Sequence, residues 1–347
     1  MVMHRMHRAT RSRNYDCRHA LFQLLGNFAS NAKLGRAFWT ESSIAHICRL
    51  RTIARRRVYA GSTFELADPL APSRTYRVKE IQSVRNPEVL ATWRLGQQSK
   101  ERRKWGRFIA EGSRVVTTLL MSGMEPLRIY VREKDSRNDL HYVEEDGPLP
   151  PNILQSDAMA WVSDAVMAKM SAAVTPSGIL AVFGIPSSPL SHELTGPGVV
   201  LANISDPGNM GTLIRTAAAL GVRTVVIQEG SDPWSPKVVQ ASAGMIGHVC
   251  LFQSAWDQVM KLQLQEGIET CALVVQGGEQ PRSICDRVDA KRLLLVVGNE
   301  AHGIPPDVLQ GCQHRMTIPM PGDGVESLNA SVAGSIAMYL MFQGKKP

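Results

Sequence analysis

MTIPMPGDGVESLNASVAGSIAMYLMF, residues 316–342, combines an apolar run, a break and a second apolar segment. The run 316–319 predicts a short strand, which Pro321 and Gly322 end. Small residues at mostly helical spacing then predict a helix over 329–342 that another backbone can approach closely. Its 14 residues are too few to span a bilayer, so we interpret it as a buried helix.

Ser327 and Asn329 stand at the start of this predicted helix. A helix N-terminus presents free N–H groups and a partial positive charge, which suit an anionic or electron-rich ligand. The alternative is an ordinary cap, in which Ser or Asn accepts hydrogen bonds from those N–H groups. This stretch alone leaves both interpretations open.

Two earlier stretches share one design with it. Residues 199–216 read VVLANISDPGNMGTLIRT, and residues 293–304 read LLLVVGNEAHGI. In each, a strongly apolar strand ends in a loop of small and polar residues. Open α/β sheets bind their ligands at this edge, beyond the carboxyl ends of the strands.

The apolar runs recur at regular intervals over the C-terminal half. They cover 199–204, 224–227, 249–252, 271–275, 293–297 and 316–319. A strand, a helix and two short loops fill such an interval, so the pattern predicts a mostly parallel sheet of six strands with helices on both faces. The chain contains neither G-x-G-x-x-G nor G-x-x-x-x-G-K-[ST], so the signatures of dinucleotide and P-loop sites are missing.

Three motifs in these stretches resemble those of the SpoU/TrmH family. They are Asn209-x-Gly211-x-x-x-Arg215, Gly298-x-Glu300-x-x-Gly303, and Ile318-Pro319-Met320 with Ser327-Leu328-Asn329. Members of this family are RNA ribose 2′-O-methyltransferases of the trefoil-knotted SPOUT class. The resemblance covers residues 196–345 and implies this fold, with a C-terminal knot, for the methyltransferase domain at 196–347.

The implied reaction transfers a methyl group from S-adenosylmethionine to a ribose 2′-hydroxyl. The sulfonium already activates the methyl group, so no metal is required. The family places its catalytic arginine at Arg215. Because arginine stays protonated in water, it either binds a neighbouring phosphate and stabilises the developing alkoxide, or is deprotonated transiently within the site. The alternative is a helix-surface arginine with an acidic neighbour.

The resemblance also assigns the other polar residues of the active site. Asn209 would orient Arg215 or the ribose, or is a turn residue of Asp-Pro-Gly-Asn. Glu300 would pair with an arginine or hold the substrate, or interacts with the first turn of a helix predicted at 304–309. Ser327 and Asn329 would contact the phosphate or ribose.

Five residues are expected to bind S-adenosylmethionine: Gly298, Ile318 and Leu328 by their match to the family, and Asn299 and Met320 as neighbours. Ile318 and Leu328 are otherwise ordinary core residues. The loop 323–326 is one residue longer than the family spacing, and Gly322 and Gly324 provide a flexible turn to absorb the additional residue.

A second domain is predicted at 78–189, with a strand at 127–131, a strand and helix over 155–170, and a closing strand at 179–183. Its K-x-R-R…F-I-A-E-G pattern is similar to the small α/β/α substrate-recognition domain of many SpoU-type enzymes. A basic cluster that includes an aromatic ring indicates contact with RNA. The alternative is an ordinary run of charged residues exposed to solvent. Its members are Arg102, Arg103, Lys104, Trp105 and Arg107.

The net charge of +8 arises in residues 1–57, which hold 11 Arg and one Lys against two acidic residues. This composition is typical of a mitochondrial targeting segment, and the competing interpretation is a retained basic arm on RNA phosphates. Residues 58–77 are predicted to be a connector. The six cysteines are scattered without a Cys-x-x-Cys pair, so we expect reduced core residues and neither disulfides nor a zinc site.

The leading hypothesis is therefore a ribose 2′-O-methyltransferase of mitochondrial large-subunit rRNA, located in the matrix and acting on a pre-ribosomal particle. The alternatives are a methyltransferase-like assembly factor that binds rRNA without catalysis, and a tRNA methyltransferase. The family further implies a homodimer formed through the knotted domain. No run of 18 apolar residues occurs, so no membrane partner is expected.

Overall fold

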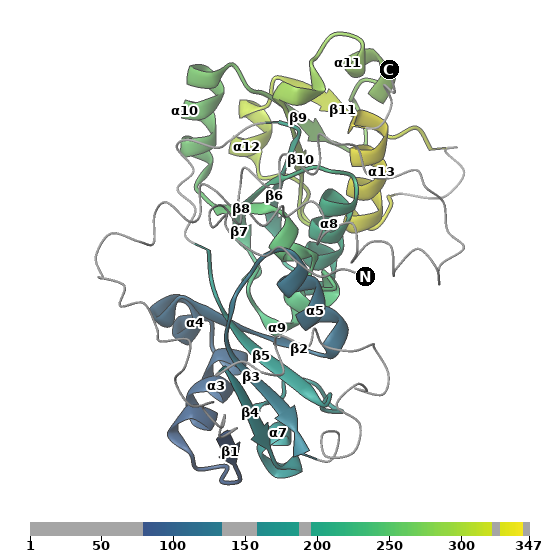
Figure 1. Cartoon of the computed structure of the whole chain (residues 1–347). Helices are drawn as coiled ribbons and strands as arrows, with labels where there is room; N and C mark the ends of the chain where they lie inside the picture. The colour runs from purple at the N-terminus through teal and green to yellow at the C-terminus, as the bar shows by residue number, and fades with distance from the viewer. Residues whose placement is uncertain (1–78, 134–157, 187–195, 321–326, 343–347) are drawn as a thin grey trace, which may run out of the picture. The chain divides into compact units, whose positions relative to one another are not determined.

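The structure is a computed structural model that describes residues 79–133, 158–186, 196–320 and 327–342 (Figure 1). The predicted leader at 1–57, the connector at 58–77 and the longer loop at 323–326 lie outside these residues. Residues 74–347 form one compact unit. Within the described ranges, no helix combines the length and the apolar character needed to cross a bilayer.

The N-terminal sheet has five strands in the order β1-β4-β3-β5-β2. β1, β4 and β3 run parallel, whereas β5 is antiparallel to both β3 and β2. The strands are β1 (Lys79–Ile81), β2 (Arg107–Glu111), β3 (Pro126–Arg132), β4 (Met159–Val162) and β5 (Ile179–Gly184). The predicted strands at 127–131 and 179–183 are confirmed as β3 and β5.

Helices lie on both faces of this sheet because alternate residues of each strand point to opposite sides. Leu180 and Val182 of β5 join the core under α3 and α7, while Ala181 and Phe183 join the core under α5. The helices are α3 (Pro87–Gln97), α4 (Ser99–Trp105), α5 (Ser113–Met121) and α7 (Asp164–Met170). The result is an α/β/α arrangement.

The C-terminal sheet has six strands in the order β11-β9-β10-β6-β7-β8, and every pairing is parallel. The strands are β6 (Gly198–Ile204), β7 (Thr224–Gly230), β8 (Cys250–Gln253), β9 (Glu269–Leu273), β10 (Leu293–Val297) and β11 (His314–Met316). The predicted six-stranded parallel sheet is confirmed. Consecutive residues of β6 are fully buried on both faces, as their unbroken apolar run requires.

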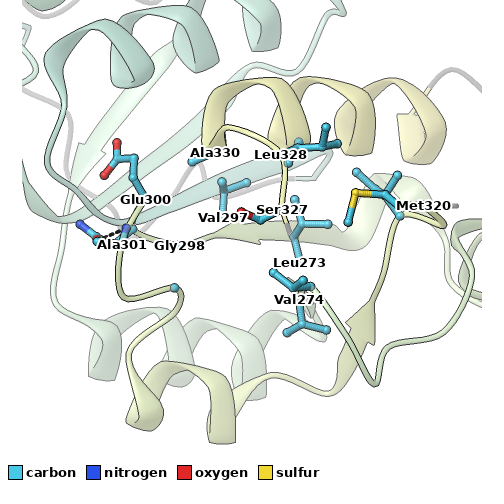
Figure 2. A pocket seen from close by; sticks show the side chains of 15 residues that line it. Leu273, Val274, Val297, Gly298, Glu300, Ala301, Met320, Ser327, Leu328 and Ala330 are labelled. Atoms are coloured by element: carbon cyan, nitrogen blue, oxygen red, sulfur yellow. Dashed lines mark hydrogen bonds between the residues drawn. The ribbon is translucent and has the colours of Figure 1, made fainter. Parts of the chain in front are cut away.

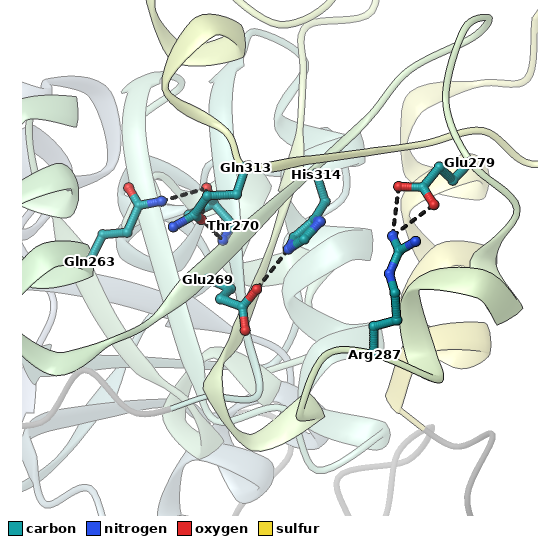
Figure 3. Close-up of polar contacts among 7 residues, drawn as sticks. All are labelled: Gln263, Glu269, Thr270, Glu279, Arg287, Gln313 and His314. Carbon is teal, nitrogen blue, oxygen red and sulfur yellow. Dashed lines mark hydrogen bonds and ion pairs between the residues drawn. The ribbon is translucent and has the colours of Figure 1, made fainter.

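The predicted boundaries of the last strand are wrong. β11 ends at Met316, whereas the apolar run predicted a strand over 316–319. The chain leaves β9 at Thr317, whose N–H donates to the carbonyl of Glu279 at 3.0 Å instead. Two hydrogen bonds from Arg287, at 2.7 and 2.8 Å, fix the carboxylate of Glu279 (Figure 3). At the start of β11, the ring of His314 contacts the carboxylate of Glu269, on the neighbouring strand β9, at 2.7 Å.

Helices cover both faces of the C-terminal sheet (Figure 1). Side chains of α8, α9, α11 and α13 pack with Val199 and Leu201 of β6, and those of α10 and α12 pack with Val200 and Ala202. These helices are α8 (Pro207–Ala219), α9 (Pro236–Ala241), α10 (Trp256–Glu266), α11 (Pro281–Cys285), α12 (Pro306–Gly311) and α13 (Ala330–Phe342).

The small residues of α13 permit a close contact within the chain. A Cβ atom at Gly334 would lie 2.5 Å from Leu213 Cδ2 of α8 and 3.2 Å from a methyl group of Val297 of β10. The hydroxyls of Thr216 and Ser335 hydrogen-bond between the same two helices at 3.0 Å. This contact holds α13 against α8 and the end of β10.

The described residues include four cysteines, which form no disulfide with one another: Cys250, Cys271, Cys285 and Cys312. Burial raises the pKa of the Cys271 thiol to about 12 and that of Cys312 to about 11, so both stay protonated at neutral pH. Cys271 is buried, as predicted for a core residue, whereas Cys250, Cys285 and Cys312 are only half-buried; Cys17 and Cys48 lie outside the described ranges.

Candidate functional site

The turn after β6 forms one wall of the site. Asp206 caps α8 by accepting a hydrogen bond from the N–H of Asn209 at 2.7 Å, and Pro207 occupies the first helical position, where no donor is needed. Asn203, at the end of β6, adopts a left-handed φ of 57°. The sequence Asn-Ile-Ser-Asp-Pro-Gly-Asn therefore turns sharply and starts a helix at the carboxyl edge of the sheet.

Asn299 joins this turn to the loop after β10. Its amide nitrogen donates to the carbonyl of Asn203 at 2.8 Å and to the hydroxyl of Ser205 at 2.5 Å. Its amide oxygen accepts from the N–H groups of Ala301 and His302 at 2.9 and 3.0 Å. The side chain is 8% exposed. It therefore acts mainly as a clamp between two loops, a role that the sequence did not predict.

Glu300, which is exposed, also contacts the turn after β6. Its carboxylate accepts a hydrogen bond from the side chain of Asn209 at 2.9 Å, with longer contacts of 3.4 Å from the N–H groups of Ser205 and Asp206. No arginine among the described residues pairs with it, and α12 begins only at Pro306. Within the described residues Glu300 contacts Asn209 and neither an arginine nor that helix, and its role in holding the substrate stays a prediction.

Arg215 lies on α8, two turns beyond Asn209, and is exposed. Among the residues that the structure describes, no acidic side chain pairs with it. Since α8 packs against α13, the helix that carries Arg215 lies beside the helix that Ser327 and Asn329 precede. A guanidinium in this setting is available for an anionic substrate.

Asn329 performs the capping role that the sequence left open. Its amide oxygen accepts hydrogen bonds from the N–H and hydroxyl of Ser331, at 2.9 and 2.7 Å, and more weakly from the N–H of Val332. Ser327 is exposed two residues earlier. The oxygen of Asn329 is therefore engaged in the helix cap, and Ser327 is the freer of the two side chains.

A pocket of about 250 Å³ opens at the carboxyl ends of β9 and β10 (Figure 2). All five residues predicted to bind the cofactor line it, together with Glu300 and Ser327, whereas Arg215, Asn209 and Asn329 do not. The remaining lining residues are Leu273, Val274, Val275, Val297, Ala301, Gly303, Ala330 and Ala333.

Sequence reasoning missed the contribution of 273–275 to this pocket. Leu273 is the last residue of β9, the neighbour of β10 in the sheet, and Val274 and Val275 follow it directly. The predicted strand at 271–275 carried the only available signal, because it too ends in small residues, Gly277 and Gly278. The order of strands in the sheet, which brings 273–275 beside Gly298, is not visible in the sequence.

A family model described as the SpoU rRNA methylase family matches residues 197–339, and one described as the MRM3-like substrate binding domain matches residues 86–181. An uncharacterised tRNA/rRNA methyltransferase of Synechocystis is 30% identical over 276 residues, which cover 76% of this chain and 94% of that protein. This chain belongs to the SpoU family of RNA methyltransferases.

Further relatives of this SpoU protein have more specific names. The 23S rRNA (guanosine(2553)-2′-O)-methyltransferase RlmP of Bacillus subtilis is 27% identical, with 76% of this chain and 98% of that protein covered. The mitochondrial rRNA methyltransferase 3 of Mus musculus is 28% identical, with 71% and 68% covered. The AdoMet-bound rRNA methyltransferase of Sinorhizobium meliloti has a TM-score of 0.64 and 25% identity, with 78% of this chain and 99% of that chain covered.

The basic cluster of this SpoU protein is only partly exposed. Arg103, Lys104, Trp105 and Arg107 are exposed around the end of α4, with the ammonium of Lys104 5.0 Å from the centre of the Trp105 ring. Arg102 is buried and pairs with Asp232. The prediction that Arg102 contacts RNA is therefore wrong, because its guanidinium faces the interior of the protein.

Proposed function

We propose that this SpoU protein is an S-adenosylmethionine-dependent ribose 2′-O-methyltransferase that acts on the large-subunit rRNA of mitochondria. The observation that carries the proposal is the pocket, since five residues predicted from separate motifs line one cavity beside Glu300 and Ser327. The 2′-O specificity in the name of the Bacillus subtilis relative and the mitochondrial rRNA in the name of the mouse relative support the substrate.

The lining of the pocket fits the cofactor. Leu273, Val297 and Leu328 give it apolar walls, and Ala330 and Ala333 of α13 leave room beside them. Ligand pockets of this kind combine apolar walls with a few convergent polar groups, here the backbone of the strand ends and the hydroxyl of Ser327. When bound, S-adenosylmethionine supplies an activated methyl group.

The chain's own residues would orient and stabilise the acceptor. In this proposal Arg215 binds an RNA phosphate and stabilises the negative charge that develops on the ribose 2′-oxygen, in keeping with a group that stays protonated. Glu300 and Asn209 hold the turn from which α8 starts, and so fix the direction of that helix. Ser327, at the pocket, contacts the ribose or its phosphate.

Replacement of Arg215 tests the catalytic part of the proposal. The side chain is exposed and unpaired with any described acidic group, so Arg215→Ala should leave the unfolding midpoint and the affinity for S-adenosylmethionine unchanged. We expect methyl transfer to fall by about 100-fold or more, as for other charge-stabilising groups. Arg282→Ala is the matched control, because Arg282 is an exposed arginine on α11.

One result would contradict the catalytic role of Arg215, and another would contradict the methyltransferase activity. An Arg215→Ala protein with unchanged ribose methylation would remove the catalytic assignment. A purified wild-type protein that binds rRNA but shows no binding of S-adenosylmethionine by calorimetry would instead be a non-catalytic assembly factor. A ribose-methylation map of mitochondrial rRNA and tRNA, with and without the protein, identifies the target.

The exposed residues at the end of α4, together with Arg107 at the start of β2, are proposed to bind the RNA backbone. Each lysine or arginine on a phosphate contributes about 0.7–0.9 to the slope of log affinity against log salt. Replacing Arg103, Lys104 and Arg107 by Gln should therefore lower the slope by about two to three. An unchanged slope would contradict the contact. Trp105→Ala tests stacking, which contributes about 1–3 kcal/mol per base.

The methyltransferase domain is further proposed to be knotted and to form a homodimer. Val332, Ile336, Tyr339 and Leu340 make an apolar stripe along α13 and are 37–60% exposed. A second copy of this chain would cover the stripe. Ile336→Glu should give a monomer by light scattering, whereas Val174→Glu, at an exposed apolar residue of the other domain, should not. A dimer that survives Ile336→Glu would place the interface elsewhere.

Residues 1–57 are proposed to direct the protein to the mitochondrial matrix. Fusion of these residues to a fluorescent protein tests this directly. Matrix import with removal of the segment supports targeting, whereas a cytosolic fusion would favour the alternative of a retained RNA-binding arm.

A further inference from the structure

Arg102 of α4 reaches out of its own domain and pairs with Asp232, in the turn that follows β7. Its Nε and one terminal nitrogen lie 2.8 and 2.6 Å from the same carboxylate oxygen of Asp232. The other terminal nitrogen donates to the carbonyl of Leu95 at 2.6 Å. The two charged side chains are 5% and 14% exposed. The pair therefore joins the two domains of the unit 74–347 in a largely dry setting.

The turn that carries Asp232 is itself held firmly. The second carboxylate oxygen of Asp232 accepts a hydrogen bond from the N–H of Trp234 at 3.0 Å, and the carbonyl of Asp232 accepts from Ser235, also at 3.0 Å. The indole of Trp234 lies 4.7 Å from the ring of Phe108, the second residue of β2. One short turn thus makes both a charged and an aromatic contact with the N-terminal domain.

Apolar packing surrounds this contact. Phe108, Val115 and Leu119 of the N-terminal domain belong to the same core as Trp234 and Ile246 of the methyltransferase domain. Burial of this apolar area supplies attraction between the domains, but the hydrophobic effect has no direction and tolerates sliding. A buried ion pair has the opposite character, because desolvation cancels much of its attraction while its geometry is strict.

We propose that Arg102 and Asp232 are positioning residues, which fix the orientation of the RNA-recognition domain on the methyltransferase domain. The inference rests on the proposed function, because a fixed orientation matters for catalysis only if RNA bound by one domain is methylated at the other. Arg103, Lys104 and Trp105 project from the same helix as Arg102 and are exposed. RNA held by these residues is thereby presented to the pocket at one distance and in one direction.

The test replaces the pair by apolar residues of similar length, Arg102→Met and Asp232→Leu, singly and together, in the full chain. Each single change leaves a buried charge unpaired, so the unfolding midpoint should fall clearly. The double change removes both charges, so the midpoint should return to the wild-type value or exceed it. An ion pair that contributes net stability would instead leave the double variant clearly less stable than the wild type.

Kinetics separate positioning from stability. In the double variant, kcat for methylation of rRNA should fall about tenfold, because bound RNA is presented correctly for less of the time. KM for RNA and the affinity for S-adenosylmethionine should change by less than about twofold. Arg103→Met is the matched control: it removes a neighbouring exposed arginine, so it should raise KM for RNA and leave the unfolding midpoint unchanged.

Hydrogen exchange reports on the pair without any assay of activity. The amides of 95–102 and 232–235 should exchange faster in the double variant, while those of β9 and β10 should not change. A double variant with wild-type kcat, or with unaltered exchange at both segments, overturns the inference. A wild-type protein without methyl transfer would instead overturn the proposed function, and the exchange and unfolding results would then decide the role of the pair.

Discussion

Gly211 lies between Asn209 and Arg215 on α8, on the side that packs against α9. A Cβ atom added there would lie 2.4 Å from the Cβ of Ala241, 2.8 Å from the carbonyl oxygen of Val238 and 2.9 Å from the backbone nitrogen of Ser242. Ordinary contacts of this kind are roughly 3.5–4.0 Å. Two of the three atoms belong to the backbone and cannot rotate away, so Gly211→Ala must push the two helices apart.

Two opposing terms set the magnitude. Overpacking of a close contact costs about 1–3 kcal/mol, and the rigid backbone atoms here favour the upper end of that range. Alanine is better than glycine inside a helix by about 1 kcal/mol, which offsets part of the cost. We therefore expect Gly211→Ala to lower the free energy of unfolding by about 2 kcal/mol, or the melting temperature by about 4–8 °C.

Gly96→Ala is the matched control. Gly96 also lies inside a helix, but its added Cβ would lie 3.0 Å from the terminal methyl of Ile109, which can move aside, and at an ordinary contact distance of 3.8 Å from the carbonyl oxygen of Met170. This variant should be as stable as the wild type or slightly more stable. Urea unfolding followed by circular dichroism measures both. Equal midpoints for Gly211→Ala, Gly96→Ala and the wild type would show that α8 and α9 do not approach as closely as the structure indicates.

Other substitutions test the clamp and two titrating groups. Asn299→Ala leaves the partners of its amide unpaired, so it should cost about 1–3 kcal/mol and weaken S-adenosylmethionine binding, measured by calorimetry. Burial, together with the charge of Arg223, lowers the pKa of His248; stability should thus decline as the pH falls below 6.5, and His248→Asn should remove this step from pH-dependent melting. Burial raises the pKa of Glu88, but contacts with Lys79, Arg128 and Tyr130 outweigh it and lower that pKa below 4.5. The folded protein therefore loses stability as the pH falls through this range, and Glu88→Gln should lose less than the wild type.

Predictions succeeded where one local pattern determines one structural outcome. β6 and β10 are buried on both faces, so their unbroken apolar runs identified them almost to the residue. The turn at 205–209 followed from the same logic, because Asp, Pro and Gly each have a local reason to stand there. The pocket was predictable in part, since parallel strands bring their carboxyl ends to one edge of the sheet.

Predictions failed where a side chain's partner lies far away in the sequence. Arg102 has the same basic character as Arg103, and only Asp232, 130 residues later, decides which of them is buried. Asn299 likewise finds Asn203 and Ser205 in another loop. An arginine or an amide side chain serves equally well in structure and in ligand binding, so residue type alone does not distinguish the two roles.

The exposed apolar stripe of α13 supports the proposal that a second copy of the chain covers this helix. Small residues of α13, such as Gly334 and Ala337, face the protein interior, so they bring the helix close to α8 without adding large side chains. The larger Ile336 and Tyr339 face outward and are 37% and 60% exposed. Helices on the surface of a monomer normally place polar residues on that side. Exposed apolar side chains on the outward face of α13 are unfavourable in water. A second protein surface that covers the stripe would remove this cost, which is the physical reason to expect a dimer.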